Sequence, residues 1–262
     1  MTQREYEEIR SILADIKKVT REELLEIIIK VNPKRNPEYL RFYIFDLVNN
    51  NIIYKLNEKF YKYNNKLKLF EYEYTKFEEP IKNQLEEKFE GIDICIWNTS
   101  FLSMFQNLLP VTNYTFIEID SNFLEYLYNH MKTDYNALLD PSVKDLELYA
   151  KGNDIVIIKK LFVRAPIVKP YSYNVAINKN LKTKKSFIFK PTIEKILVDI
   201  FVESELYDVF NDIEDLYRGI LKTYCVNFQK LFAYSKYRGI TEELSNFIMN
   251  RIKFDFNIGE FV

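Results

Sequence analysis

Hydrophobic side chains are spaced along the chain in a way that predicts a helical beginning, a mixed middle and a helical end. Residues 3–18, 20–31 and 37–48 each carry apolar side chains every three or four positions, the spacing of one helix face. Thr20 and Glu23 have the spacing of a capping box, in which each side chain bonds the other residue's backbone amide. The second helix is therefore expected to begin at Thr20.

Two strand-like segments, residues 52–56 and 59–63, follow the three helices. The order of helices and hairpin predicts a winged helix-turn-helix over residues 1–68, whose third helix would enter the DNA major groove. Residues 20–68 hold ten basic side chains against six acidic ones, which suits contact with phosphates. The side chains expected to contact DNA are Lys34, Arg35, Asn36, Tyr39, Arg41, Tyr43, Lys55, Lys59 and Lys62. Because winged helices also serve as protein-docking modules, a docking role is the alternative.

The remainder of the chain divides into a connector and a larger part. Residues 69–91 carry seven glutamates, which predicts an acidic, solvated linker made of an extended strand followed by a surface helix. Short apolar runs at 92–97, 114–119 and 154–159 alternate with helical segments, which favours an α/β layer with a parallel core. Residues 92–262 are therefore expected to form an α/β and helical partner-binding domain. The predicted fold class is α+β or α/β, with an N-terminal winged helix, a central α/β layer and a C-terminal helical array.

A basic segment precedes the helical array. From Lys159 to Lys190 there are nine basic side chains and no acidic one, and residues 161–185 are expected to be irregular. A solvated loop explains this run, and a surface for an acidic protein or a nucleic acid is the alternative. The lysines assigned to partner binding are Lys182, Lys184, Lys185 and Lys190.

The first helix of the array, at residues 193–201, has apolar side chains at three- and four-residue spacing. Thr192 suits its N-cap. Glu194, Lys195 and Asp199 are expected on its polar side, where Lys195 can pair with Asp199 four positions later.

Composition narrows the possible chemistry. The chain has 262 residues, a net charge of −1, two cysteines and one histidine. Cys95 and Cys225 are far apart, so neither a disulfide scaffold nor a zinc site is predicted, and the lone His130 predicts no catalytic pair. Five glycines without a phosphate-loop pattern argue against nucleotide binding. No cofactor or metal is expected, and the lack of an apolar signal or membrane-length run predicts a cytoplasmic protein.

A metal-dependent nuclease is the enzymatic alternative. Glu118 and Asp120 lie near the end of one expected strand, and Asp154 and Lys159 bracket another. Such a site needs carboxylates that converge on a divalent metal, with a cation beside the phosphate. Because Asp154 and Lys159 are five positions apart, they should point to opposite faces of their strand. The spacing therefore identifies no active site.

The order of these parts resembles that of the AbiEi-like antitoxins of bacterial type IV toxin–antitoxin and abortive-infection systems. The residues that carry the resemblance are strands 94–97 and 115–119, the proline-led helix with Pro191, Glu194, Lys195 and Asp199, and the small-aromatic-basic-glycine segment 233–239. The resemblance implies a non-catalytic protein whose winged helix binds operator DNA and represses its own operon. It also implies that the protein opposes a nucleotidyltransferase-like toxin made beside it.

Overall fold

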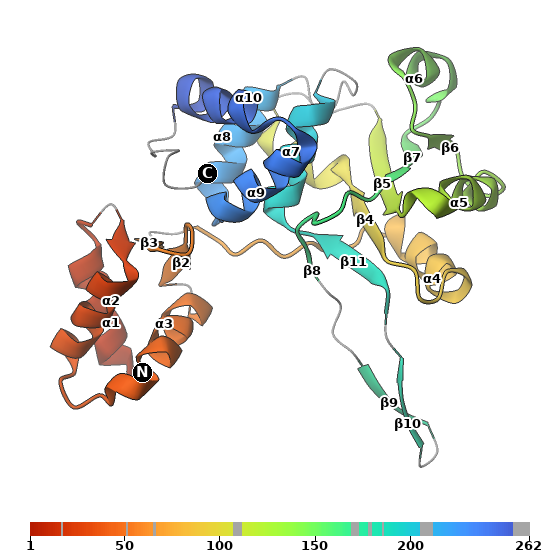
Figure 1. Ribbon diagram of the computed structural model, residues 1–262. Coiled ribbons are helices and arrows are strands. Elements are labelled where there is room, and N and C mark those ends of the chain that lie inside the picture. Colours follow the sequence, from red (N-terminus) through yellow and green to blue (C-terminus); the bar gives the residue numbers. More distant parts are fainter. Residues whose placement is uncertain are drawn as a thin grey trace.

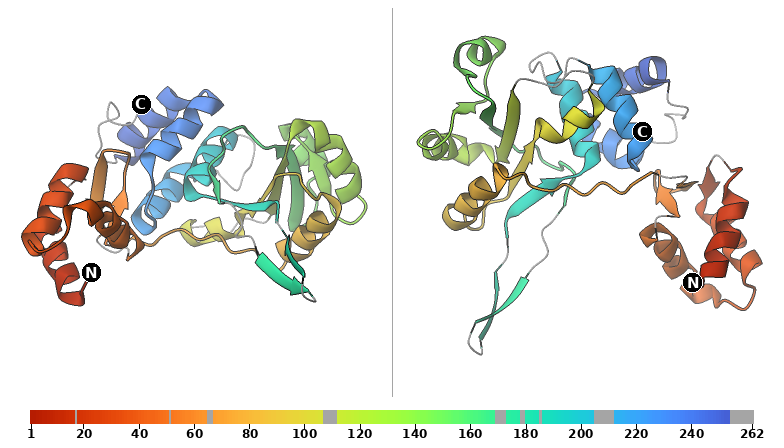
Figure 2. Two further views of the ribbon diagram at one scale, coloured as in Figure 1. Left: turned by 60° about the horizontal axis from the view of Figure 1, so that its bottom comes forward. Right: turned by 180° about the vertical axis from the view of Figure 1, so that it is seen from behind.

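The computed structural model shows an α+β protein with two parts, which an extended segment connects (Figure 1). The structure describes residues 1–16, 18–50, 52–64, 67–106, 112–168, 173–177, 180–184, 186–204 and 212–253. We call residues 1–64 the N-terminal unit and residues 70–253 the body. Figure 2 shows the same division from two further directions. Among the described residues, no helix has the length and apolar character needed to cross a membrane.

The N-terminal unit packs three helices against a small antiparallel sheet. Its helices are α1 (Gln3–Leu13), α2 (Arg21–Val31) and α3 (Leu40–Asn49), and a 3₁₀ turn, η1 (Pro37–Tyr39), leads into α3. Its strands are β1 (Val19–Thr20), β2 (Ile53–Lys55) and β3 (Phe60–Tyr63), in the order β1-β3-β2. The predicted capping box at Thr20 is confirmed, since Thr20 accepts from the Glu23 amide and Glu23 accepts from the Thr20 amide. Ile9, Leu24 and Leu47 lie in the shared core.

The body is built on a six-stranded sheet. Its strands are β4 (Ile94–Asn98), β5 (Asn113–Ile119), β6 (Ala137–Leu139), β7 (Asp154–Lys160), β8 (Ile167–Val168) and β11 (Ile188–Pro191), in the order β6-β7-β5-β4-β11-β8. β6, β7 and β5 are parallel to one another, but β4 runs antiparallel to β5. The expected parallel core is therefore wrong at this pair. A parallel pair needs a crossover, whereas the described residues between β4 and β5 form a 3₁₀ helix, η2 (Thr99–Phe105).

Helices cover both faces of this sheet. On one face lie α4 (Glu78–Lys88) and α5 (Leu124–Met131), and on the other α7 (Ile193–Glu203), α8 (Ile213–Thr223), α9 (Phe228–Arg238) and α10 (Thr241–Asn246). Side chains alternate along each strand, so Ile94 and Ile96 join the core with α4 and α5, whereas Cys95 and Trp97 join the core with α7. The short helix α6 (Val143–Tyr149) lies beyond β6 (Figure 1).

Two segments differ from the sequence prediction. In the acidic segment the expected helix is present as α4, but it packs on the sheet, and the buried Glu78 carboxylate accepts from the Tyr72 hydroxyl and the Thr75 amide, each at 2.7 Å. The expectation that residues 161–185 are irregular is wrong for the described part of that range. It contains β8, which pairs with β11, and the strands β9 (Tyr173–Ile177) and β10 (Asn180–Lys184), which pair with each other. Residues 169–172, 178–179 and 185 lie outside the described residues.

The hairpin of the N-terminal unit contacts the body. The Leu56 carbonyl, in the turn between β2 and β3, accepts from the Gln229 amide at 3.2 Å. Lys68, in the connecting segment, pairs through its backbone with Thr223 and Cys225 at 2.7 and 2.9 Å. Leu56 is also buried in the same core as Val226. The hairpin turn is thus a point of attachment to the body.

Candidate functional site

The side chains expected to contact DNA fall into an exposed group and an anchored group. Lys34, Asn36, Tyr39, Arg41 and Lys59 are exposed around α3 and the hairpin, whereas Lys55 and Lys62 are half-buried.

Arg35 and Tyr43 are anchored inside the N-terminal unit. The Arg35 guanidinium pairs with the Glu5 carboxylate at 2.5 Å and lies 3.9 Å from the centre of the Tyr43 ring. Asn32 donates to the same carboxylate at 2.7 Å. Arg35 therefore links α1, the turn after α2, and α3. These contacts suit a role in holding α3 in place.

These contacts also change the acidity of Glu5. Burial favours its neutral form, but hydrogen bonds from Asn32, the Thr2 amide and Arg35 outweigh burial and lower its pKa from 4.5 to about 2. Glu5 is therefore ionised at neutral pH and holds Arg35 as an ion pair.

Sequence reasoning missed an aromatic face on α3. Tyr39, Phe42 and Phe45 are 52%, 55% and 64% exposed, and the rings of Tyr39 and Phe42 are 6.0 Å apart. The Arg41 guanidinium lies 5.5 Å from the centre of the Phe42 ring. The signal was present in the sequence, because positions three apart share a helix face. We call Tyr39, Phe42 and Phe45 the aromatic face.

The lysines assigned to partner binding lie in different elements. Lys190 lies in β11, half-buried, with its ammonium 5.1 Å from the centre of the Tyr74 ring. Lys182 and Lys184 lie in β10, whereas Lys185 is outside the described residues.

The expectation that α7 has a polar side is wrong. Lys195 is fully buried, and Asp199 and Glu194 are 5% and 6% exposed. α7 lies between the sheet and the neighbouring helices, so none of its positions from Ile193 to Ile200 faces solvent. The predicted pairing of Lys195 with Asp199 is confirmed, at 2.6 Å.

Lys195 and Asp199 belong to a larger group that we call the buried charge cluster: Glu118, Lys195, Asp199 and Arg238. The Lys195 ammonium contacts the Glu118 carboxylate at 2.5 Å, and Arg238 contacts Asp199 at 2.5 Å. The Trp97 indole N–H donates to Glu118 at 2.9 Å, so the carboxylate has two donors. The cluster joins β5, α7 and α9.

Burial and pairing act against each other in this cluster. Burial raises the pKa of Glu118, against the attraction of Lys195. Burial alone would lower the pKa of Lys195, but the carboxylates of Asp199 and Glu118 raise it well above its ordinary value. The two neighbouring carboxylates therefore favour the charged form of Lys195. Two carboxylates and two cations balance in charge, as burial of ionised groups requires.

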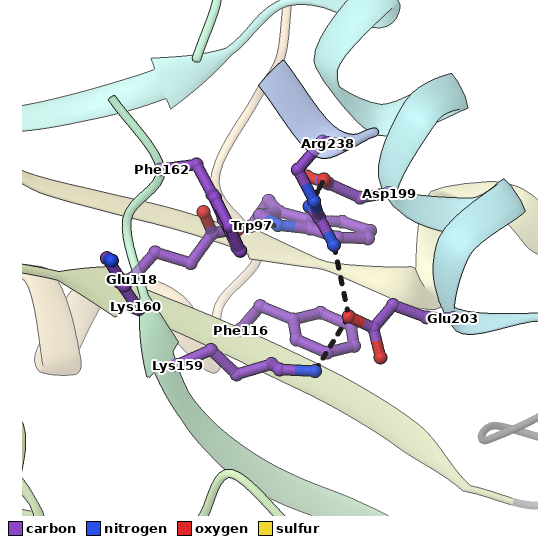
Figure 3. Close-up of a pocket in the computed structure, with 9 residues that line it drawn as sticks. All are labelled: Trp97, Phe116, Glu118, Lys159, Lys160, Phe162, Asp199, Glu203 and Arg238. Carbon is purple, nitrogen blue, oxygen red and sulfur yellow. Dashed lines mark hydrogen bonds and ion pairs between the residues drawn. The ribbon is translucent and has the colours of Figure 1, made fainter. Parts of the chain in front are cut away.

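A pocket of about 310 Å³, its open mouth included, lies beside this cluster (Figure 3). Its lining is Trp97, Phe116, Glu118, Lys159, Lys160, Phe162, Asp199, Glu203 and Arg238. At its rim, Lys159 pairs with Glu203 at 2.7 Å, and Arg238 lies 3.6 Å from the same carboxylate. These charges hold β7, α7 and α9 together, and the geometry favours a structural role for them.

The carboxylates of the nuclease alternative do not converge. Glu118 pairs in register with Lys159, whereas Asp154 pairs with Asn113, so Glu118 and Asp154 are about 17 Å apart along the sheet. Asp120 is exposed, and its carboxylate accepts from the Asn122 amide at 2.9 Å. Among the described residues, no group of three or more His, Cys, Asp or Glu side chains could hold a metal ion. Glu118, Asp120 and Asp154 therefore do not form the metal site that the nuclease alternative requires.

The fold defines an α+β protein in which a small helical unit is attached to a layered body with buried ion pairs. The chain belongs to DUF6577, a family of unknown function, whose model matches residues 39–253. That match begins just before α3 and continues through the hairpin and the body, while α1 and α2 precede it. A search of curated proteins finds no match to the chain.

Proposed function

We propose that this protein is a DNA-binding regulator whose N-terminal unit is a winged helix. The observation that carries the proposal is the arrangement of α1, α2 and α3 with the sheet β1-β3-β2, because three helices followed by a hairpin are the parts of that motif. The exposure of Lys34, Arg41 and Lys59 supports the proposal, since phosphate contacts require accessible cations.

In this proposal the residues around α3 have different roles. Lys34, Arg41 and Lys59 contact phosphates, while Asn36 and Tyr39 approach base edges from the beginning of α3. Arg35 and Tyr43 hold α3 in place through their contacts with each other and with Glu5. In the hairpin turn Leu56 is attached to the body, whereas Lys59 at the other end of the same turn is exposed. Lys59 is therefore the hairpin residue that contacts DNA.

The DNA partner in this proposal is the operator upstream of the protein's own operon. The second partner is a nucleotidyltransferase-like toxin, which the body would counteract. Both suggestions rest on the sequence resemblance to the AbiEi-like antitoxins, which includes Lys195 and Asp199. In this structure those two residues support the body through the buried charge cluster.

A DNA titration tests the proposal. The variant Lys34→Ala/Arg41→Ala/Lys59→Ala should bind the upstream DNA more weakly than the wild type. Its plot of log affinity against log salt should be less steep by about 2 to 3, since each lost phosphate contact contributes about 0.9. The matched control is Lys144→Ala/Lys151→Ala/Lys222→Ala, which removes three exposed body lysines. Equal binding by the two variants would show that the N-terminal unit is not the DNA contact.

A protein-docking role for the N-terminal unit is the second candidate, and the aromatic face favours it. Three large exposed rings on one helix are typical of the centre of a protein interface. The variant Phe42→Ala/Phe45→Ala separates the two functions. Under the docking function it abolishes binding to the protein encoded beside this chain, and the wild type does not bind the upstream DNA at physiological salt. Under the regulator proposal the wild type binds that DNA.

A further inference from the structure

The basic segment that precedes α7 contains a β-arm. Residues 155–193 include no Asp or Glu, and they carry nine basic side chains. Within them β9 and β10 form an antiparallel ladder, from Tyr173 opposite Lys184 to Ile177 opposite Asn180. We call residues 173–184 the arm.

The arm continues an edge hairpin of the main sheet. β8 and β11 are antiparallel neighbours at the sheet edge, and the chain runs from β8 through β9 and β10 to β11. In the described part of the chain, β9 and β10 pair only with each other. Figures 1 and 2 show the arm projecting away from the body.

The stability, the open edges and the charge of the arm all favour binding to a partner. An isolated two-stranded hairpin is marginally stable in water, and both outer edges of this one have no neighbouring strand among the described residues. Lys182 and Lys184 are two positions apart on one strand, so their backbones are about 7 Å apart. Residues 155–193 hold no Asp or Glu, so the segment that contains the arm carries a net positive charge. A bound polyanion supplies the compensating negative charge and the contacts that order the arm.

We propose that the arm binds the sugar-phosphate backbone of double-stranded DNA as a second contact beside the N-terminal unit. A two-stranded ribbon has the width that the major groove accepts. In Figure 1 the N-terminal unit lies below and to the left of the body, and the arm projects below it at the other end. The inference rests on the proposed function for the identity of the polyanion.

The arm adds affinity that does not depend on base sequence, because phosphate contacts position a protein and base contacts specify the site. The test uses the full chain and two duplexes of equal length, the upstream DNA and a scrambled sequence. Lys182→Ala/Lys184→Ala should weaken binding to both duplexes to the same extent, on the order of tenfold, and reduce the salt slope by about 2. Lys182→Glu/Lys184→Glu should weaken both further.

The control variant Lys222→Ala/Lys230→Ala removes two exposed lysines from α8 and α9, and it should bind both duplexes as the wild type does. If the arm variants bind like this control, the arm inference is wrong. Thermal unfolding of all variants should be unchanged, because β9 and β10 pair only with each other in the described part of the chain. A fall in binding that accompanies a fall in the unfolding midpoint would also count against the inference.

Two further comparisons separate the arm from the N-terminal unit. If Lys34→Ala/Arg41→Ala/Lys59→Ala binds DNA normally while the arm variant does not, the regulator proposal fails and the arm inference stands. The reverse result leaves the regulator proposal and removes the arm. Polyglutamate is the probe for an acidic protein partner. Arm variants that lose polyglutamate binding but keep DNA binding would overturn the choice of DNA.

Discussion

The buried charge cluster and the exposed cations around α3 use the same types of side chain in opposite ways. Lys195 has no exposed surface and contacts two carboxylates at 2.5 and 2.6 Å. Lys34 and Arg41 are exposed on the N-terminal unit. In the body the cations hold elements together, whereas around α3 they are available to a partner. Surroundings, rather than residue type, therefore decide whether a cation supports the fold or stays available to a ligand.

This comparison predicts the largest stability loss at Lys195. In Lys195→Met the side chain keeps its length, but the Glu118 and Asp199 carboxylates lose a cation in a buried site. Breaking a buried ion pair on one side costs about 3 to 5 kcal/mol of unfolding free energy. Urea unfolding can be followed by the fluorescence of Trp97, the single tryptophan, whose indole donates to Glu118.

The double variant Lys195→Met/Glu118→Gln is the control for this prediction. It keeps the region electrically balanced, because Asp199 still pairs with Arg238, and it should recover part of the lost stability. A loss below about 1 kcal/mol in the single variant would mean that the cluster behaves like surface ion pairs, and the contrast with α3 would disappear.

The N-terminal unit has a largely buried pair as well, Arg35 with Glu5, and an intermediate effect is expected there. The pKa of Glu5 is about 2 in the folded chain against an ordinary 4.5. Between these pH values the unfolded chain binds a proton that the folded chain does not, so stability falls as the pH falls. After allowance for screening at this partly accessible pair, the contribution is about 2 kcal/mol.

Glu5→Gln should therefore be less stable than the wild type at pH 7, and the difference should shrink as the pH falls from about 4.5 towards 2. Hydrogen exchange of amides in α1 and α3 measures this locally. A difference that is constant over this pH range would show that the Glu5 carboxylate is not held in its ionised form by Asn32 and Arg35.

The sequence predicted local features well and burial poorly. The capping box at Thr20 is confirmed because such a signal depends on neighbouring residues alone. The pairing of Lys195 with Asp199 was also predictable from its four-residue spacing. Their burial was not, because it depends on the sheet and α9 packing around α7. The antiparallel direction of β4 and β5 likewise depends on the path of the chain between them, and the spacing of apolar residues does not predict that path.

Removal of one helix N-cap should reduce the free energy of unfolding by a smaller amount, and by a similar amount in the two regions. Thr20 caps α2 in the N-terminal unit and Thr192 caps α7 in the body, each accepting from a backbone amide three positions later. Thr20→Ala and Thr192→Ala should each cost about 1 kcal/mol, since each leaves an amide without its acceptor. Urea unfolding of the two variants measures both. A much larger loss at Thr192 alone would show that the helix cap supports the buried charge cluster as well.

The smallest stability effect is expected where the functional effect is largest. Lys34→Ala/Arg41→Ala removes two exposed cations, so its unfolding free energy should stay within about 0.5 kcal/mol of the wild type. Its DNA affinity should fall, with a salt slope reduced by about 2. Urea unfolding and a salt titration on the same preparation measure both quantities. If the variant is destabilised as strongly as Glu5→Gln, these side chains support the fold, and the distinction between inward and outward cations fails in the N-terminal unit.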